Sequence, residues 1–321
     1  MTEITRRSLL AGSVLAAALP LTRPAAAAAP ASGRQAAAIY RYKIGSYELT
    51  AIYDGVWIRA IDEKFVRNAS FADVQKELAD NFLPTDRLPI PFTTLLVNTG
   101  AKLVLIDTGT GGQMAATAGS MMDNLKTAGV DPTAVDVILI SHFHPDHING
   151  LVDKEGRKVF PNAEINVPAG EWAFWMDETK LGTAPEGIKG VFLNAHRVFK
   201  DIKDVNRFEP GREVAPGIAS IAAYGHTPGH VAFAIASGNA SMLVLSDTTN
   251  HPWLFARHPE WQAAFDMDGP MAVENRRRLL DRAAADKMLV QGYHFPFPAS
   301  GHIVKTASGY EHIPVMWQPA L

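Results

Sequence analysis

The 321-residue chain contains no cysteine, and this absence excludes disulfides, thiolate nucleophiles and cysteine-ligated metal sites. Any metal ion must therefore be held by His, Asp or Glu side chains. The chain also has little excess charge of either sign, because its formal net charge is −3, and it contains no run of basic residues. A phosphate backbone needs clustered Lys and Arg for binding. We therefore expect no nucleic-acid partner.

The remaining composition is that of an ordinary folded protein. Apolar residues make up 47% and charged residues 20% of the chain, which excludes disordered, collagen-like and coiled-coil classes. The length allows one large domain or two. No Gly/Ser-rich or Pro-rich linker divides residues 40–321. We therefore expect a single domain over 40–321, with no membrane-spanning segment in the mature protein.

The first 31 residues have the features of an export signal. Arg6 and Arg7 precede an apolar run from Leu9 to Leu21, and an Ala-rich stretch at 25–31 follows. The apolar run is shorter than the roughly 20 residues that a membrane-spanning helix needs. We interpret residues 1–31 as a twin-arginine (Tat) signal peptide, with a frayed helix of the mature fold as the alternative. The mature protein is then expected in a bacterial periplasm or outside the cell.

Hydrophobic patterns predict two groups of strands with helices between them. Strands are expected at 40–46, 47–53, 92–98, 102–106, 135–140, 218–223, 230–236, 241–245 and 287–291. Helices are expected at 72–81, 113–128, 169–177 and 271–285. The first helix has Ser70 as a candidate N-cap, the second ends at Gly129, and the fourth follows Pro270. This order favours two sheets inside and helices outside.

Candidate metal ligands concentrate where predicted strands end. The densest cluster, His142-Phe143-His144-Pro145-Asp146-His147, follows the apolar run 135–140 directly. His226, Asp247 and His294 stand near the ends of later strands. Imidazole and carboxylate donors without sulfur favour an open catalytic site for Zn²⁺ or another first-row divalent ion. The alternative is a His-rich surface loop that binds no metal, and the three later candidates argue against it.

The run from His142 to His147 matches the motif His-x-His-x-Asp-His, and Leu105-Ile106-Asp107-Thr108-Gly109 adds a second match. On these motifs the chain resembles the metallo-β-lactamase superfamily over essentially all of residues 40–321. The resemblance implies an α/β fold of the αββα sandwich type, with a dinuclear metal site at the edge of the two sheets. It also implies two divalent metal ions per chain, with Zn²⁺ as the expected metal and Mn, Co or Fe as alternatives.

The resemblance assigns a role to each candidate ligand. One metal would be held by His142, His144 and His226, the other by Asp146, His147 and His294, and Asp247 would bridge them. A hydroxide held between the metals would be the nucleophile, with Asp146 and Asp247 as the catalytic carboxylates. Asp107 and His230 are expected to support the ligands through hydrogen bonds without binding metal.

Within the superfamily the chain is similar to methyl parathion hydrolase and related lactonases and esterases, as at Phe160-Pro161-Asn162-Ala163. By this likeness Trp175 and Phe192 match aromatic residues that line the leaving-group pocket, and Met114 replaces another. Asn250 stands where one group of acyl-homoserine lactonases has tyrosine. We therefore expect a small-molecule substrate, an aryl ester or aryl lactone, with weaker phosphotriesterase activity.

Several alternatives stay open. An N-acyl-homoserine lactonase or a β-lactamase would use the same fold, although the familiar zinc β-lactamases have a cysteine ligand. An iron-dependent oxidoreductase of this fold is more remote, since the diiron type has a carboxylate where this chain has His144. A metal-binding protein without catalysis is a third class. A homodimer is also left open by the sequence.

Overall fold

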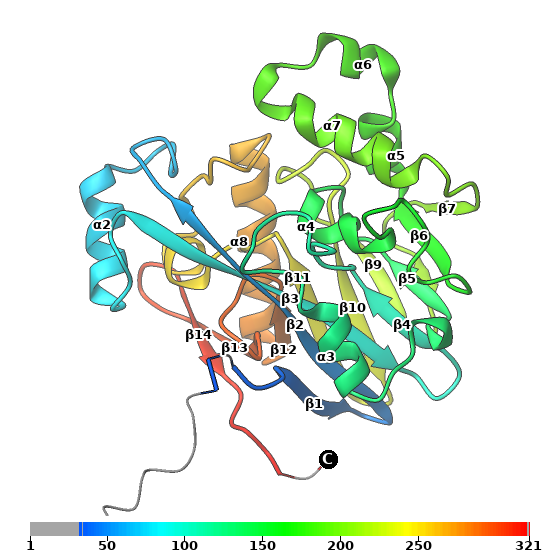
Figure 1. Cartoon of the computed structure of the whole chain (residues 1–321). Helices are drawn as coiled ribbons and strands as arrows, with labels where there is room; N and C mark the ends of the chain where they lie inside the picture. Colours follow the sequence, from blue (N-terminus) through cyan, green and yellow to red (C-terminus); the bar gives the residue numbers. More distant parts are fainter. Residues whose placement is uncertain (1–31, 34, 320) are drawn as a thin grey trace, which may run out of the picture. The chain divides into compact units, whose positions relative to one another are not determined.

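The computed structural model describes residues 32–33, 35–319 and 321 (Figure 1). The predicted export signal lies outside the described residues. Residues 37–321 form one compact unit, to which the description below refers. No helix in the described part of the chain has the length and apolar character needed to cross a membrane.

The first sheet contains seven strands in the order of the sequence. They are β1 (Ile39–Ile44), β2 (Tyr47–Ala60), β3 (Arg87–Asn98), β4 (Leu103–Ile106), β5 (Val137–Leu139), β6 (Glu164–Pro168) and β7 (Val205–Phe208). Pairing is antiparallel from β1 to β4 and parallel from β4 to β7. The parallel strands therefore end at the same edge of the sheet.

The second sheet also has seven strands, ordered from β14 to β8. They are β8 (Glu213–Ala215), β9 (Ile218–Ala222), β10 (Val231–Ser237), β11 (Ala240–Ser246), β12 (Leu289–Gly292), β13 (Ser300–Lys305) and β14 (Tyr310–Pro314). Only β11 and β12 pair in parallel, and α8 lies between them in the sequence. The last residues of these two strands accordingly lie side by side, with Ser246 paired to Gly292.

The helices connect the strands. They are α2 (Phe71–Asp80), α3 (Met121–Thr127), α4 (Pro145–Ile148), α5 (Ala169–Trp175), α6 (Glu178–Thr183), α7 (Glu186–Phe199) and α8 (Gly269–Ala285). Short 3₁₀ turns lie at Pro132–Ala134 and Asn149–Leu151, and a π-helical turn lies at Pro252–Ala256. The Ser70 side chain caps α2 as predicted, by accepting a hydrogen bond from the Asp73 N–H.

Strand side chains alternate between two cores, and this alternation produces the layers. On β11, Met242 and Val244 pack into the core between the sheets, whereas Leu243 and Leu245 face α8. A third core lies between the first sheet and helices α3, α5 and α7, which Figure 1 draws in green. The predicted αββα sandwich is therefore confirmed.

The predicted helix over 113–128 is wrong in its first half. Only Met121–Thr127 is helical, because the buried carboxylate of Asp54 accepts the N–H of Met121 and the Asp54 carbonyl accepts the N–H of Gly119. Gly119 has a φ of 113°, which no helix allows. The sequence did not predict helices α4, α6 and α7 or strands β6, β7, β8, β13 and β14. Strand β2 ends later, and strand β3 begins earlier, than predicted.

The core between the sheets can be tested with two phenylalanines. Phe233 on β10 is fully buried there, whereas the Phe82 side chain is 97% exposed. Phe233→Ala should lower the free energy of unfolding by about 3–5 kcal/mol, because it removes buried apolar surface and leaves a cavity. Phe82→Ala should change it by less than about 0.5 kcal/mol. Urea unfolding measures the free energy of unfolding of both variants. Equal decreases in the two variants would show that Phe233 does not contribute to a core between the sheets.

Candidate metal centre

The seven predicted ligands come from four loops that follow or precede strands of both sheets. Strand β5 leads into the segment 142–147, in which Pro145 starts the short helix α4. His226 lies in the loop between β9 and β10, Asp247 directly follows β11, and His294 follows β12. The two sheets therefore each contribute part of the cluster.

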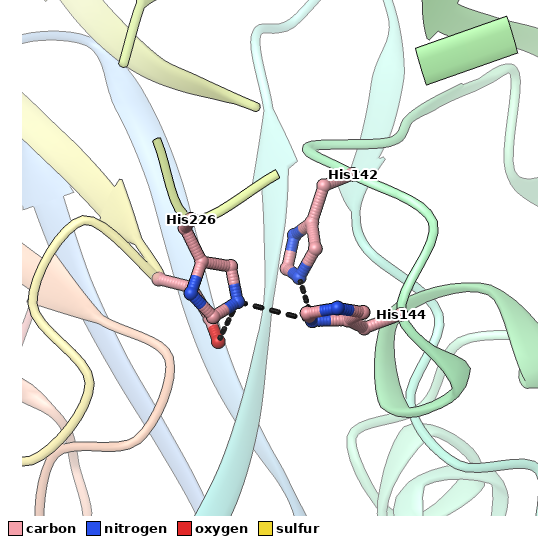
Figure 2. A group of neighbouring side chains, drawn as sticks. His142, His144 and His226 are labelled. Atoms are coloured by element: carbon pink, nitrogen blue, oxygen red, sulfur yellow. Dashed lines mark hydrogen bonds and ion pairs between the residues drawn. The ribbon is translucent and has the colours of Figure 1, made fainter. Parts of the chain in front are cut away.

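The first group of ligand-type side chains is His142, His144, His226 and Asp247. The Nδ1 atom of His144 lies 3.0 Å from Nε2 of His142 and 3.0 Å from Nε2 of His226. Figure 2 shows these three rings pointing toward one another, with His142 and His144 on one loop and His226 on another. Three nitrogens thus converge on one point, as a metal ion requires.

The second group is Asp146, His147 and His294. Nε2 of His147 lies 3.4 Å from Asp146 Oδ2, and Nε2 of His294 lies 3.6 Å from the same oxygen. Asp247 joins the two groups, because its carboxylate lies 3.2 Å from His147 and 2.8 Å from His294 as well as 3.3 Å from His226. The structure therefore brings all seven predicted residues together.

Two buried atoms in this cluster fit a bound cation. His147 Nε2 and Asp247 Oδ1 make no hydrogen bond, although both are shielded from solvent. Buried polar atoms are rarely left unpaired, because each loses its hydration without compensation. A divalent ion between the ring nitrogen and the carboxylate would satisfy both atoms. The nitrogen and oxygen donors of the cluster also suit Zn²⁺, so these residues fit a bound divalent metal ion.

The outer nitrogens of three histidines are held by acceptors. Nδ1 of His147 lies 2.8 Å from Asp107 Oδ2, Nδ1 of His226 lies 3.0 Å from Asp266 Oδ1, and Nδ1 of His294 lies 2.9 Å from the Pro91 carbonyl. Each acceptor favours the N–H on Nδ1 and leaves the lone pair of Nε2 facing the cluster. Metal-binding histidines show this pattern almost without exception.

A cavity of about 200 Å³ opens directly above the cluster. Apolar side chains form most of its wall, and His144, Asp146, His226, Asp247 and His294 form its floor. The other lining residues are Trp57, Ile90, Phe92, Met114, Pro145, Val191, Asn250 and Phe265. None of the described residues that line this cavity is Lys or Arg. An uncharged organic molecule suits such a site better than a phosphate anion.

The family model described as Metallo-beta-lactamase superfamily matches residues 89–290, which include six of the seven cluster residues. The chain belongs to the metallo-β-lactamase superfamily. The seventh residue, His294, lies just beyond the matched segment.

Two solved structures of this superfamily type resemble the whole compact unit. AidC, a dizinc quorum-quenching lactonase in complex with a product, is 29% identical, with a TM-score of 0.82 over 88% of this chain and 99% of that chain. The hydrolase AbOPH is 27% identical, with a TM-score of 0.82 over 89% of this chain and all of that chain.

A probable metallo-hydrolase of Mycobacterium bovis is 26% identical over 183 residues, which are 49% of this chain. This chain spans only 56% of the length of that curated relative.

The electrostatics of this superfamily site are set by burial and by its carboxylates. Burial lowers the pKa of His144 to about 3, with the neighbouring charge of His226 acting in the same direction. Burial also opposes the charge of His226, but hydrogen bonds to Asp247 and Asp266 outweigh it and raise the pKa of His226 to about 9. Without metal, protons thus take the place of cations beside the carboxylates, and metal binding must release them.

The two predicted supporting residues occupy positions outside both ligand groups. Asp107 accepts the N–H and the hydroxyl of Ser141 as well as His147 Nδ1, so it fixes the ligand loop. His230 donates from Nδ1 to the Ala223 carbonyl, and its Nε2 accepts the backbone N–H of Asp247. Both ring nitrogens of His230 are therefore occupied, which agrees with the supporting role expected for it.

The predicted substrate pocket needs a correction. Met114 and Asn250 line the cavity, but Trp175 and Phe192 do not. Both side chains lie in the core between the first sheet and α5 and α7, with Trp175 fully buried and its indole N–H bonded to Glu171. Phe192 belongs to helix α7, which the sequence did not predict, and its ring packs against Trp175 with the ring centres 4.7 Å apart. Trp57 and Phe265 supply aromatic wall in their place.

Asp266 is a residue of the site that the sequence did not reveal. Its carboxylate holds His226 Nδ1 and pairs with the buried guanidinium of Arg276 at 3.1 Å. Arg276 in turn donates to the carbonyls of Thr248 and Trp261. No motif marks Asp266, because it lies 40 positions from His226 in an irregular segment. Only the fold brings the two together.

Asp266→Asn should weaken metal binding about 10-fold, because it removes the charge that orients His226. Asp268→Asn makes the same chemical change two positions away. Asp268 caps α8 through the Met271 N–H, and Asn serves equally well as an N-cap. Competitive titration with a chelator measures the affinity of each variant for Zn²⁺. Wild-type affinity in Asp266→Asn, or equal weakening in both variants, would contradict this role.

Proposed function

We propose that this protein is a metal-dependent hydrolase that cleaves ester or lactone bonds in a small apolar substrate. It would bind two divalent ions, with Zn²⁺ as the expected metal. The observation that carries the proposal is the pair of ligand groups sharing Asp247 at the floor of an apolar cavity. We retain the expectation of twin-arginine export as part of this proposal.

The ligand assignment follows the two groups. His142, His144 and His226 would hold one ion, Asp146, His147 and His294 the other, and Asp247 both. Two such ions supply Lewis acidity toward a carbonyl oxygen and make an oxygen nucleophile available at neutral pH. Asp146 and Asp247 line the cavity and would be the carboxylates that hold these ions next to the substrate. This arrangement needs no serine or cysteine nucleophile.

The chain's own side chains orient the substrate and exclude water from it. Trp57, Phe92 and Phe265 form an aromatic wall, and the Arg59 guanidinium lies over two of these rings, 4.7 Å from the Phe265 ring centre and 4.9 Å from the Trp57 ring centre. Asn250 is buried at the cavity, and its Oδ1 atom has no partner. Its amide is thus available for one polar group of a substrate.

Lactone hydrolysis has the strongest support. AidC, a lactonase whose structure contains the product N-hexanoyl-L-homoserine, matches 88% of this chain at 29% identity. A six-carbon acyl chain is uncharged and flexible, so it suits an apolar wall without Lys or Arg. The earlier preference for aryl substrates depended partly on Trp175 and Phe192, which lie in the core. Acyl-homoserine lactones therefore become the first substrate class to test.

Aryl esters and aryl lactones are the second candidate. The aromatic rings of Trp57, Phe92 and Phe265 at the cavity favour a flat leaving group, since aromatic pairs gain energy beyond their buried area. Phosphotriester cleavage would be a weaker activity of the same site.

The test is a hydrolysis panel with the Zn²⁺-loaded protein. It contains N-hexanoyl-homoserine lactone, an aryl ester, an aryl lactone, an aryl phosphotriester and a β-lactam. We expect the highest kcat/KM with the homoserine lactone, a lower value with the aryl esters and lactones, and little turnover of the β-lactam. Activity should disappear on chelation and return on reloading with Zn²⁺.

Phe265→Ala provides a check on the cavity. It should raise KM several-fold with little change in kcat, because an apolar wall binds ground state and transition state about equally. Phe82→Ala, at an exposed position, serves as the matched control. No turnover of any ester or lactone by the metal-loaded protein would contradict the proposed function. A kcat/KM for the β-lactam above those for all esters and lactones would show that the protein is a β-lactamase instead.

A further inference from the structure

Glu171 is a buried carboxylate in α5 that the proposed chemistry does not use. Its side chain has no exposed surface. Three N–H groups donate to it: Phe143 N and Trp175 Nε1 to Oε2, both at 2.8 Å, and Gly229 N to Oε1 at 2.7 Å. Burial raises the pKa of Glu171, and the hydrogen bonds from these N–H groups act in the opposite direction by stabilising the ionised carboxylate, whose oxygens only accept.

The two backbone donors belong to two different ligand loops. Phe143 stands between His142 and His144 in the loop after β5, and Gly229 stands three residues after His226 in the loop before β10. One loop leaves the first sheet and the other enters the second. A single carboxylate therefore bonds both loops, with one oxygen for each.

A pair of glycines allows this close approach. A Cβ atom on Gly229 would lie 2.2 Å from the Glu171 backbone nitrogen, which real Cβ atoms do not tolerate. A Cβ atom on Gly170 would lie 3.1 Å from the Gly229 Cα atom. The backbone of α5 thus touches the His226 loop directly. This contact and the hydrogen bond from Gly229 N together fix the spacing between α5 and the His226 loop.

We propose that Glu171 is a positioning residue that sets the spacing of His144 and His226, and through it the metal affinity of the group His142, His144 and His226. The proposal rests on the metal-dependent function proposed above. Nε2 of His226 and Nδ1 of His144 lie 3.0 Å apart, so a small movement of either loop changes their convergence. Glu171 neither lines the cavity nor belongs to a ligand group.

Glu171→Gln tests the proposal, because its amide NH₂ would face an N–H donor and cannot accept a hydrogen bond. We expect the group His142, His144 and His226 to lose affinity for its ion about 10-fold or more, and the other group to keep nearly its wild-type affinity. In a titration, one ion should therefore bind as in the wild type and the other more weakly. Competitive titration with a chelator measures both steps. The visible absorption of the Co²⁺-loaded protein should change as well, since the ligand geometry of one site changes.

Asp54→Asn is the matched control. Asp54 is also a fully buried carboxylate, and it accepts hydrogen bonds from Thr110 N and Met121 N, which are outside both ligand loops. It should lose stability as Glu171→Gln does, yet keep both metal affinities and the Co²⁺ spectrum. Equal loss of metal in both variants would show that the effect is general destabilisation and would overturn the proposal.

Gly170→Ala covers the case in which Glu171→Gln does not fold. It keeps the carboxylate and adds only the Cβ that crowds Gly229, so we expect a smaller loss of affinity in the same step. Wild-type affinities and an unchanged Co²⁺ spectrum in both folded variants would overturn the positioning role. Wild-type protein that binds no metal would instead overturn the proposed function, so the two failures are distinguishable.

Discussion

The carboxylate of Asp247 is the point on which the site depends. It lies within 3.3 Å of His226, His147 and His294, and these histidines come from loops of both sheets. A buried anion is unfavourable unless cations or hydrogen-bond donors surround it. In the metal-free protein, the carboxylates raise the pKa of His147 and of His226, so protons on these two rings supply that charge, and in our account two divalent ions replace them. The same requirement explains why the flanking histidines are held by Asp107 and Asp266.

The fold supplies this convergence through parallel strand pairs. The parallel pairing of β4, β5 and β6 places Asp107 and the loop 142–147 at one edge of the first sheet. The parallel pairing of β11 and β12 places Asp247 and His294 at an edge of the second. Six of the seven ligands follow parallel strands, whose carboxyl ends meet at one edge of a sheet, and His226 comes from the loop between the antiparallel strands β9 and β10. The long antiparallel strands β2 and β3 contribute Trp57 and Phe92 to the cavity wall.

The sequence predicted the sandwich and the composition of the cluster because both have local signals. The motif at 142–147 and the runs of alternating apolar residues are short patterns that do not depend on distant partners. The cavity wall and the supporting contacts have no such signal. Trp175 lies in the core because it packs against Phe192 of helix α7, and Glu171 and Asp266 acquire their roles from partners 28 or more positions away. Tertiary packing decides these roles, and no short pattern encodes it.

The number of divalent ions bound per chain, compared between the wild-type protein and Asp247→Ala, tests the central claim most directly. The measurement is elemental analysis of each protein after reconstitution with Zn²⁺ and removal of free metal. Our account predicts about two ions in the wild type and a loss that affects both ions in the variant, since one carboxylate serves both groups. One ion or fewer in the wild type, or two ions retained by a folded Asp247→Ala variant, would contradict the shared-carboxylate site.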